Sequence, residues 1–292
     1  MIRVAMGGLR VEIRHDDRTV EAALAERWGP FVERPESETA AAPADATLDA
    51  HVVDADAFPG AATATDVARR SPLPGGGTRV LRADFALDLK RGARGWQGAA
   101  LERPSPGRPT ESCLRLLLAA ALLDRGRLLL HAAATASGAG DGAPAAVLFG
   151  PSGAGKTTFA YLAAVCGADV LGDDLVVVGD GGRGAAPPAV WGTPFSGDRY
   201  PPGRPLCRPL GGLFALEHAA DDRDTLIAVE PAEAARRLLR CVVSYRTDAG
   251  AAELVLAHVA GLLAARPAAR LAFLPTAAAV ALVRRRLEAP AP

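Results

Sequence analysis

A glycine-rich loop between an apolar run and a helical segment constrains this chain more than any other feature. Residues 145–149 are continuously apolar, as expected for a buried strand, and lead directly into the loop 150–158, GPSGAGKTT. The loop fits the pattern G-x-x-x-x-G-K-[ST], and residues 157–166 after it are predicted to be helical. Strand, loop and helix in this order predict a mixed α/β domain that binds phosphate groups.

The expected ligand follows from the chemistry of the loop. Glycines let backbone N–H groups turn inward, and the N-terminus of the following helix adds free donors and partial positive charge. Lys156, one of two lysines in the chain, is expected to reach the β and γ phosphates, and the Thr157 hydroxyl to ligate Mg²⁺. We therefore expect ATP with Mg²⁺. The predicted nucleotide-binding residues are Gly150, Ser152, Gly153, Ala154, Gly155, Lys156, Thr157 and Thr158.

Two adjacent aspartates, Asp173 and Asp174, follow the predicted strand at 169–172. A right-handed crossover would bring the end of that strand beside the loop. One carboxylate could then hold Mg²⁺, and the other could accept the proton of an attacking hydroxyl. Neighbouring residues of a regular strand point to opposite faces, so both serve one site only if the strand ends or bends there, which Gly172 permits. The alternative is that one aspartate caps a turn and only the other binds metal.

His131 lies in a predicted apolar strand at 127–134. Two interpretations are equally supported by the sequence. It is either a core histidine whose hydrogen bonds are satisfied, or a partner that orients one of the aspartates.

Composition limits the expected partners. The 292 residues carry 33 basic and 33 acidic side chains, so no net charge attracts nucleic acid or an anionic membrane. The longest apolar run, 116–123, is far shorter than the roughly 20 residues that cross a bilayer. No signal-peptide pattern opens the chain, and the four cysteines form no CxxC pair. We expect a cytoplasmic protein with reduced thiols and with no nucleic-acid or membrane partner.

Two domains are predicted, a small α+β domain at residues 1–108 and a larger α/β domain at 111–292, joined by a proline-rich linker. The first is expected to contain strands at 1–13, 47–54 and 78–89, a helix at 20–28 and a connector at 34–47. The second is expected to contain helices at 111–123, 157–166, from 231, 251–264 and 276–287, and strands at 127–134, 145–149, 169–172, 175–178, 189–192, 210–216, 225–229 and 270–274.

Four segments carry a family resemblance: LLLHAAA, VLFGPSGAGKTT, ADVLGDDLVVV and GTPFSG. In this order and spacing they resemble the HPr serine kinase C-terminal domain superfamily, especially the stand-alone HPr-kinase-like proteins of peptide-modification gene clusters, which include lasso peptide precursor kinases. The resemblance covers about residues 111–292. It implies a P-loop kinase domain of the HPr kinase/phosphoenolpyruvate carboxykinase type. The implied activity is transfer of the γ-phosphate of ATP to a serine or threonine hydroxyl of a peptide or protein, with a ribosomal natural-product precursor as one candidate acceptor.

The resemblance also implies roles for single residues. Lys156 and Thr157 would bind the phosphates and Mg²⁺, Asp173 would be the general base, and Asp174 would belong to the Mg²⁺ shell. His131 would be the partner of Asp173, and the two aspartates could be exchanged. Because HPr kinases form hexamers, self-association is compatible with the resemblance.

The chain departs from the family pattern in two places. HPr kinases carry an acidic residue in a glycine-containing signature, but residues 190–197 have no carboxylate before Asp198. They also carry an arginine in a Pro-Gly-Arg segment that stabilises the transferring phosphoryl group; this chain offers Arg204 and Arg208. These arginines either neutralise charge in the transition state or are solvated loop residues. A dock for HPr is not recognisable, so HPr is not the expected acceptor.

Two other functions compete with the peptide kinase. An ATP-dependent switch or assembly protein would bind nucleotide without transferring phosphate, but would have no need of a base for a foreign hydroxyl. A small-molecule kinase differs only in acceptor loops, which no motif describes. The sequence therefore leaves the acceptor open.

Overall fold

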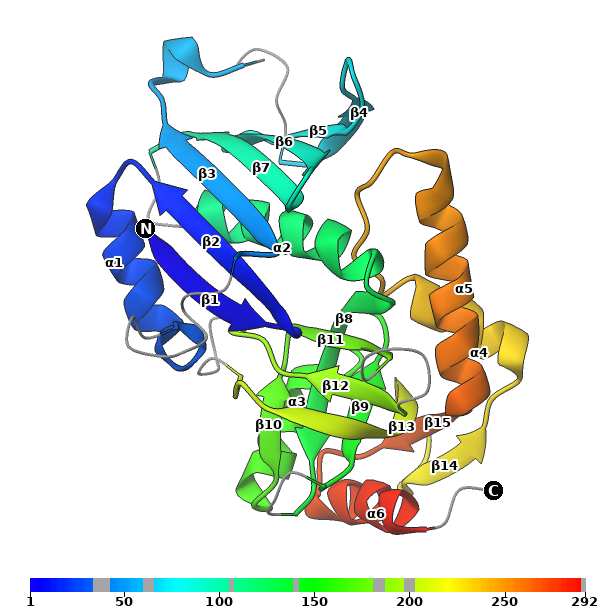
Figure 1. The fold of residues 1–292 in the computed structure, drawn as a ribbon. Coiled ribbons are helices and arrows are strands. Elements are labelled where there is room, and N and C mark those ends of the chain that lie inside the picture. The colour runs from blue at the N-terminus through cyan, green and yellow to red at the C-terminus, as the bar shows by residue number, and fades with distance from the viewer. Residues whose placement is uncertain are drawn as a thin grey trace. The chain divides into compact units, whose positions relative to one another are not determined.

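The structure is a computed structural model, and it describes residues 1–33, 43–59, 66–104, 108–138, 142–180, 187–196 and 203–289. The chain divides into two compact units (Figure 1). The first comprises Met1–Arg125 and Ser244–Glu253, and the second Gly126–Val243 and Leu254–Pro292. Each unit is a mixed α/β structure built on one sheet, as predicted. In the described ranges, no helix is long and apolar enough to cross a membrane.

The first unit holds a sheet of seven described strands in the order β1-β2-β3-β7-β6-β5-β4. The strands are β1 (Ile2–Met6), β2 (Leu9–His15), β3 (Ala46–Val52), β4 (Arg69–Pro72), β5 (Thr78–Leu81), β6 (Phe85–Gly92) and β7 (Gly95–Glu102), and the helices are α1 (Arg18–Arg27), α2 (Arg108–Leu123) and the short 3-10 turns η1 (Gly29–Phe31) and η3 (Ala55–Ala57). Strands β4 and β7 were not predicted, and two predicted strands each divide into a pair. Most of the connector predicted at 34–47 lies outside the described residues.

Helix α2 belongs to the first unit. Leu114, Leu117 and Leu122 are fully buried, because α2 packs against β7, β3 and β6. The unit boundary therefore lies after α2, whereas the sequence placed it before that helix. The apolar face of α2 needs the sheet, and the proline-rich segment ahead of it does not separate the two.

The segment Ser244–Glu253 is held in the first unit by polar contacts. The Arg246 guanidinium donates to Asp124 at 2.6 Å and lies over the Trp96 ring. Close by in sequence, the Thr247 and Thr78 hydroxyls are 2.9 Å apart.

In the second unit, the described strands form an eight-stranded sheet that contains a barrel. The strands are β8 (Arg127–Ala136), β9 (Ala145–Phe149), β10 (Asp169–Gly172), β11 (Leu175–Asp180), β12 (Pro188–Trp191), β13 (Cys207–His218), β14 (Thr225–Ala228) and β15 (Ala268–Phe273). The helices are α3 (Lys156–Val165), α4 (Pro231–Leu239), α6 (Ala277–Glu288) and α5 (Ala249–Ala265), which belongs to this unit from Leu254 on. Strands β8, β9, β13, β12 and β11 pair in a closed ring, and β10, β15 and β14 extend the sheet beyond it.

Strand β9, helix α3 and strand β10 form a crossover connection, and β8 lies between the two connected strands. Both β9 and β10 pair antiparallel with β8, so they run parallel to each other on its two sides. The ends of β9 and β10 therefore lie at the same end of β8, as the crossover predicted from sequence requires.

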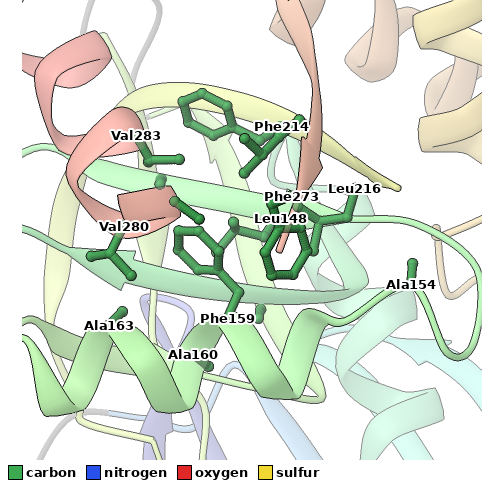
Figure 2. Packing of buried hydrophobic residues seen from close by; sticks show 14 residues of the cluster. Leu148, Ala154, Phe159, Ala160, Ala163, Phe214, Leu216, Phe273, Val280 and Val283 are labelled. Atoms are coloured by element: carbon green, nitrogen blue, oxygen red, sulfur yellow. The ribbon is translucent and has the colours of Figure 1, made fainter. Parts of the chain in front are cut away.

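Helices α3 and α6 cover one face of this sheet and share an apolar core with it. Phe159 projects from α3 into the space between the helix and the strands, close to Leu148 and Phe273 (Figure 2). The Phe159 and Phe273 rings meet edge to face with centroids 5.7 Å apart, an arrangement that favours aromatic pairs. This core fixes the start of α3, and hence the loop before it, on the sheet.

Replacing Phe159 with alanine should lower the free energy of unfolding by about 3–5 kcal/mol, because the side chain is buried and leaves a cavity. Urea denaturation followed by circular dichroism measures the loss. Val165→Ala on the same helix is the matched control, since Val165 is 69% exposed and should change stability by less than about 0.5 kcal/mol. Equal losses in the two variants would contradict the packing described.

Candidate functional site

Strand β8 changes neighbours at His131 and Ala132, and the glycine-rich loop leaves the sheet at that point. Ala132 pairs with Phe149, the last residue of β9. Beyond it, residues 241–243 take the place of β9: the His131 N–H donates to the Cys241 carbonyl at 2.7 Å, and Leu130 bridges Val242. His131 is thus next to the first residues of the loop.

The opposite edge of β8 breaks at the same level. Gly172 at the end of β10 pairs with Ala134, and Leu175 at the start of β11 pairs with His131, so β10 and β11 follow one another along this edge. The pairing register shifts between Val170 and Gly172, and Asp173 and Asp174 form the bend between the strands. Both aspartates can serve one site only if the strand ends or bends at them. The structure has a bend at this position.

Close backbone contacts hold the bend in place. A Cβ atom on Gly172 would lie 2.8 Å from the Leu175 carbonyl oxygen, so glycine is required by space. The Ala132 N–H donates to the Asp174 carbonyl at 3.2 Å. From the GTPFSG segment, the Thr193 hydroxyl donates to the Leu175 carbonyl at 2.5 Å.

The glycine-rich loop has the geometry of an anion-binding turn. Gly153 and Gly155 have φ angles of 80° and 93°, in the left-handed region that glycine adopts without a Cβ clash. Helix α3 starts immediately after Gly155. Its first residue, Lys156, is 7% exposed and donates from Nζ to the Gly150 and Pro151 carbonyls at 2.9 and 3.0 Å.

Burial lowers the pKa of the Lys156 ammonium, and the nearby Asp174 carboxylate opposes this shift. A desolvated cation without a full counter-charge is stabilised by a bound anion. The electrostatics of the loop therefore match its geometry: both favour a negatively charged ligand.

His131 and Asp174 form the closest pair of candidate residues. The His131 Nδ1 atom lies 3.1 Å from the Asp174 Oδ1 atom, with the side chains 46% and 21% exposed. His131 is therefore half-exposed and paired with a carboxylate, and its interpretation as a core residue is wrong. The resemblance assigned Asp173 as its partner, whereas the structure records the contact with Asp174. Asp173 is 4% exposed.

A cavity of about 810 Å³ opens beside the loop. It is lined by the first half of the loop, by His131, by the end of β13 and by the end of α4. The His218 Nε2 atom of β13 is hydrogen-bonded to the Gly153 carbonyl oxygen at 2.8 Å. The volume lies within the range of roughly 300–1,000 Å³ that ligand sites occupy.

Arg204 and Arg208 do not lie at the loop in this structure. Both contact Asp169, Arg204 by a short ion pair and Arg208 at 3.9 Å. Asp169 pairs with Ala136, which pairs with Ala145 at the start of β9, whereas the loop follows the end of that strand. The two arginines therefore both contact the first residue of β10, and neither is among the residues that line the cavity beside the loop.

The other predicted ligands lie in or beside the loop. Gly150 and Ala154 line the cavity with Ser152 and Gly153, and Thr157 and Thr158 are exposed on the first turn of α3. Within the described ranges, no group of three or more His, Cys, Asp or Glu side chains could hold a metal. A metal here would need ligands from a bound phosphate, which is how Mg²⁺ is usually held.

Sequence reasoning missed Glu217, His218, Arg240 and Cys241, which line the cavity. They reach the loop through the pairing of β13 with β9 and of residues 241–243 with β8. These contacts join segments far apart in the chain, so no local pattern could have found them.

No model of a known protein family matches this chain, and no curated protein matches it.

Replacing Gly155 with alanine should destabilise the loop more than the same change at Gly153. Both glycines have positive φ, which costs alanine roughly 1–2 kcal/mol. Only at Gly155 would the new Cβ lie 2.7 Å from the Phe273 ring, whereas nothing lies within 4 Å at Gly153. We expect an extra loss of about 1–3 kcal/mol at Gly155 by urea denaturation.

The double variant Gly155→Ala/Phe273→Leu tests the cause of that extra loss. It should be more stable than the sum of its two single changes, since the smaller Leu side chain relieves the overlap. Strict additivity would show that the Phe273 ring does not support the loop.

Proposed function

We propose that this chain is an ATP-dependent phosphotransferase whose second unit is a P-loop kinase domain of the HPr kinase/phosphoenolpyruvate carboxykinase type. The proposed acceptor is a serine or threonine hydroxyl of a peptide or protein, with a ribosomal natural-product precursor as a candidate. One observation carries the proposal: the loop with Lys156 and the bend with Asp173 and Asp174 flank the same two residues of β8. Phosphate-binding groups and carboxylates thus share one end of the sheet.

The loop residues supply the binding of the nucleotide. Inward N–H groups of the loop and of the N-terminus of α3 donate hydrogen bonds to phosphate oxygens. Lys156 exchanges its bonds to the Gly150 and Pro151 carbonyls for bonds to the terminal phosphates. Thr157 and one aspartate are the residues that would hold Mg²⁺. When bound, Mg²⁺ neutralises charge on the β and γ phosphates.

The transfer step needs one carboxylate as a base. The acceptor hydroxyl oxygen attacks the γ phosphorus, its proton passes to the carboxylate, and the bond from the γ phosphorus to the β–γ bridging oxygen breaks. The products are ADP, the phosphorylated acceptor and a proton that the carboxylate later releases to water. Lys156 stabilises the negative charge that develops on the leaving β phosphate.

The contacts favour Asp174 over Asp173 as that base. Asp174 is the aspartate paired with His131 and the one close enough to Lys156 to act on its pKa, and it is the more exposed of the two. Asp173 then becomes the candidate Mg²⁺ ligand. This order is the reverse of the one that the family resemblance implies. In it, His131 is a positioning residue that holds the Asp174 carboxylate.

The competing functions differ in what happens to the phosphate. A switch or assembly protein would bind ATP and release at most inorganic phosphate, and a small-molecule kinase would leave peptides unmodified. The pairing of His131 with Asp174 at 3.1 Å favours a kinase, since an oriented carboxylate suits proton transfer. The cavity of about 810 Å³ is compatible with either kind of acceptor.

Incubation of the purified protein with Mg-ATP and peptides encoded near its gene tests the proposal. We expect a peptide mass gain equal to one phosphate, with ADP formed in equal amount. ATP hydrolysis with no modified peptide would support the switch, and consumption of ATP only with a small hydroxyl compound would support the small-molecule kinase. Absence of nucleotide binding would refute all three.

Substituting each aspartate with asparagine should show which of the two is the base and which is the metal ligand. Asp174→Asn is expected to lower kcat by roughly 10²–10⁴-fold at saturating Mg²⁺, the usual contribution of a general base. Asp173→Asn is expected mainly to raise the Mg²⁺ concentration needed for half-maximal transfer. The reverse pattern would restore the order that the resemblance implies. Asp222→Asn, at an exposed loop position, is the control for loss of one carboxylate and should match the parent.

Removing the His131 side chain should weaken transfer through Asp174. We expect His131→Ala to lower kcat by roughly 10-fold or more with little change in KM, as for other positioning residues. His131→Asn should recover part of the loss, because the Asn Nδ2 group can donate to the Asp174 carboxylate from nearly the position of Nδ1. Equal kcat values for the Ala and Asn variants would argue against a positioning role.

A further inference from the structure

The transferred phosphoryl group needs cationic partners besides Lys156, and the two arginines that the family resemblance offered, Arg204 and Arg208, contact Asp169 and are not among the residues that line the cavity beside the loop. The cavity beside the loop offers others. Among its described lining residues, the arginines are Arg237 and Arg240, from the end of α4. The two have different surroundings, which decide what each can do.

Arg237 has a structural role, because it is paired with two carboxylates. Its guanidinium contacts Glu217 of β13 at 2.5 Å and Glu233 one helical turn earlier at 2.7 Å. Together with the buried Ala234 and Leu238, these contacts hold α4 against β13. Arg237 therefore fixes the position of the helix end, and its charge is already balanced by two carboxylates.

Arg240 is available for a ligand. It caps the C-terminus of α4, its side chain is exposed, and it contacts no carboxylate in the part of the chain that the structure describes. An arginine in a cavity without a counter-ion is suited to bind a phosphate oxygen, because its planar fork can donate two parallel hydrogen bonds.

The residue after Arg240 ties this helix end to the loop. The Cys241 thiol lies 4.0 Å from the Gly150 carbonyl oxygen, and the Cys241 carbonyl accepts the His131 N–H at 2.7 Å. Burial raises the pKa of the Cys241 thiol, so it stays a neutral packing group. Arg240 is thus held beside the first residue of the loop.

That end of the loop is where the terminal phosphates of a nucleotide belong. Lys156 Nζ lies against the Gly150 and Pro151 carbonyls, and the lysine of this motif reaches the β and γ phosphates. The Lys156 Nζ atom and the Cys241 thiol both contact the Gly150 carbonyl, so the segment that carries Arg240 borders the same point.

We propose that Arg240 contacts the γ-phosphate of the bound nucleotide and stabilises the charge on the phosphoryl group during transfer. The inference rests on the proposed function and adds to it the residue that distinguishes a triphosphate from a diphosphate. It gives to a residue of α4 the role that the family resemblance offered as one of two interpretations of Arg204 and Arg208.

Calorimetric titration with ADP and with the β,γ-imido analogue of ATP, both with Mg²⁺, tests this contact without needing the acceptor. In Arg240→Ala, affinity for the triphosphate analogue should fall about 10-fold or more, the effect of losing a charge-assisted bond. Affinity for ADP should stay within about 2-fold. Arg240→Lys should lie between Arg240→Ala and the parent for the triphosphate, since it keeps the charge and loses the fork.

Arg236→Ala is the matched control, because Arg236 is exposed on the same helix and is not among the cavity residues; both affinities should be unchanged. If Arg240→Ala weakens both nucleotides equally, or neither, the γ-phosphate contact is refuted while nucleotide binding stands. If the parent protein binds neither nucleotide, the proposed function is refuted, and so is this inference, which rests on it. Thermal unfolding of each variant, compared with the parent, shows whether a lost affinity reflects lost folding.

Discussion

The pairing of β8 with different strands above and below His131 is the constraint on which the candidate site depends. Where β9 ends on one side, the glycine-rich loop departs. Where β10 gives way to β11 on the other side, the chain bends through Asp173 and Asp174. Because both breaks fall at the same level of one strand, a cationic loop and two carboxylates meet without any long connection. The closed ring of β8, β9, β13, β12 and β11 holds that level fixed.

The charges of the site and their burial determine which ligand it favours. Lys156 is buried against loop carbonyls, with its pKa lowered by burial, so an anion is the ligand that relieves the cost. Asp174 is paired with His131, and Arg240 lines the same cavity from α4 without a counter-ion among the described residues. Cations on one side and an oriented carboxylate on the other suit the binding of a phosphate chain and the removal of a proton beside it.

Much of the second unit could be predicted from the sequence, because its strands and helices carry continuous local patterns. The loop and the helix after it follow from residue types that leave few alternatives, whereas Gly172 only permitted a bend at the two aspartates. Strand β7 was missed since two of its buried positions are Gly98 and Glu102, which hide the apolar alternation; the Glu102 carboxylate is bonded to Thr110. The sites of Arg204, Arg208 and Arg240 depend on contacts between distant segments, which no local pattern records.

Hydrogen–deuterium exchange in the presence and absence of Mg-ATP tests the central claim most directly, namely that the loop and the aspartate bend form one phosphate site. We predict slower exchange of amides in residues 150–158 and in residues 172–175, with the same dependence on nucleotide concentration, because one ligand contacts both segments. Protection of the loop alone would contradict a shared site. Unchanged exchange in both segments at saturating nucleotide would contradict nucleotide binding by this loop.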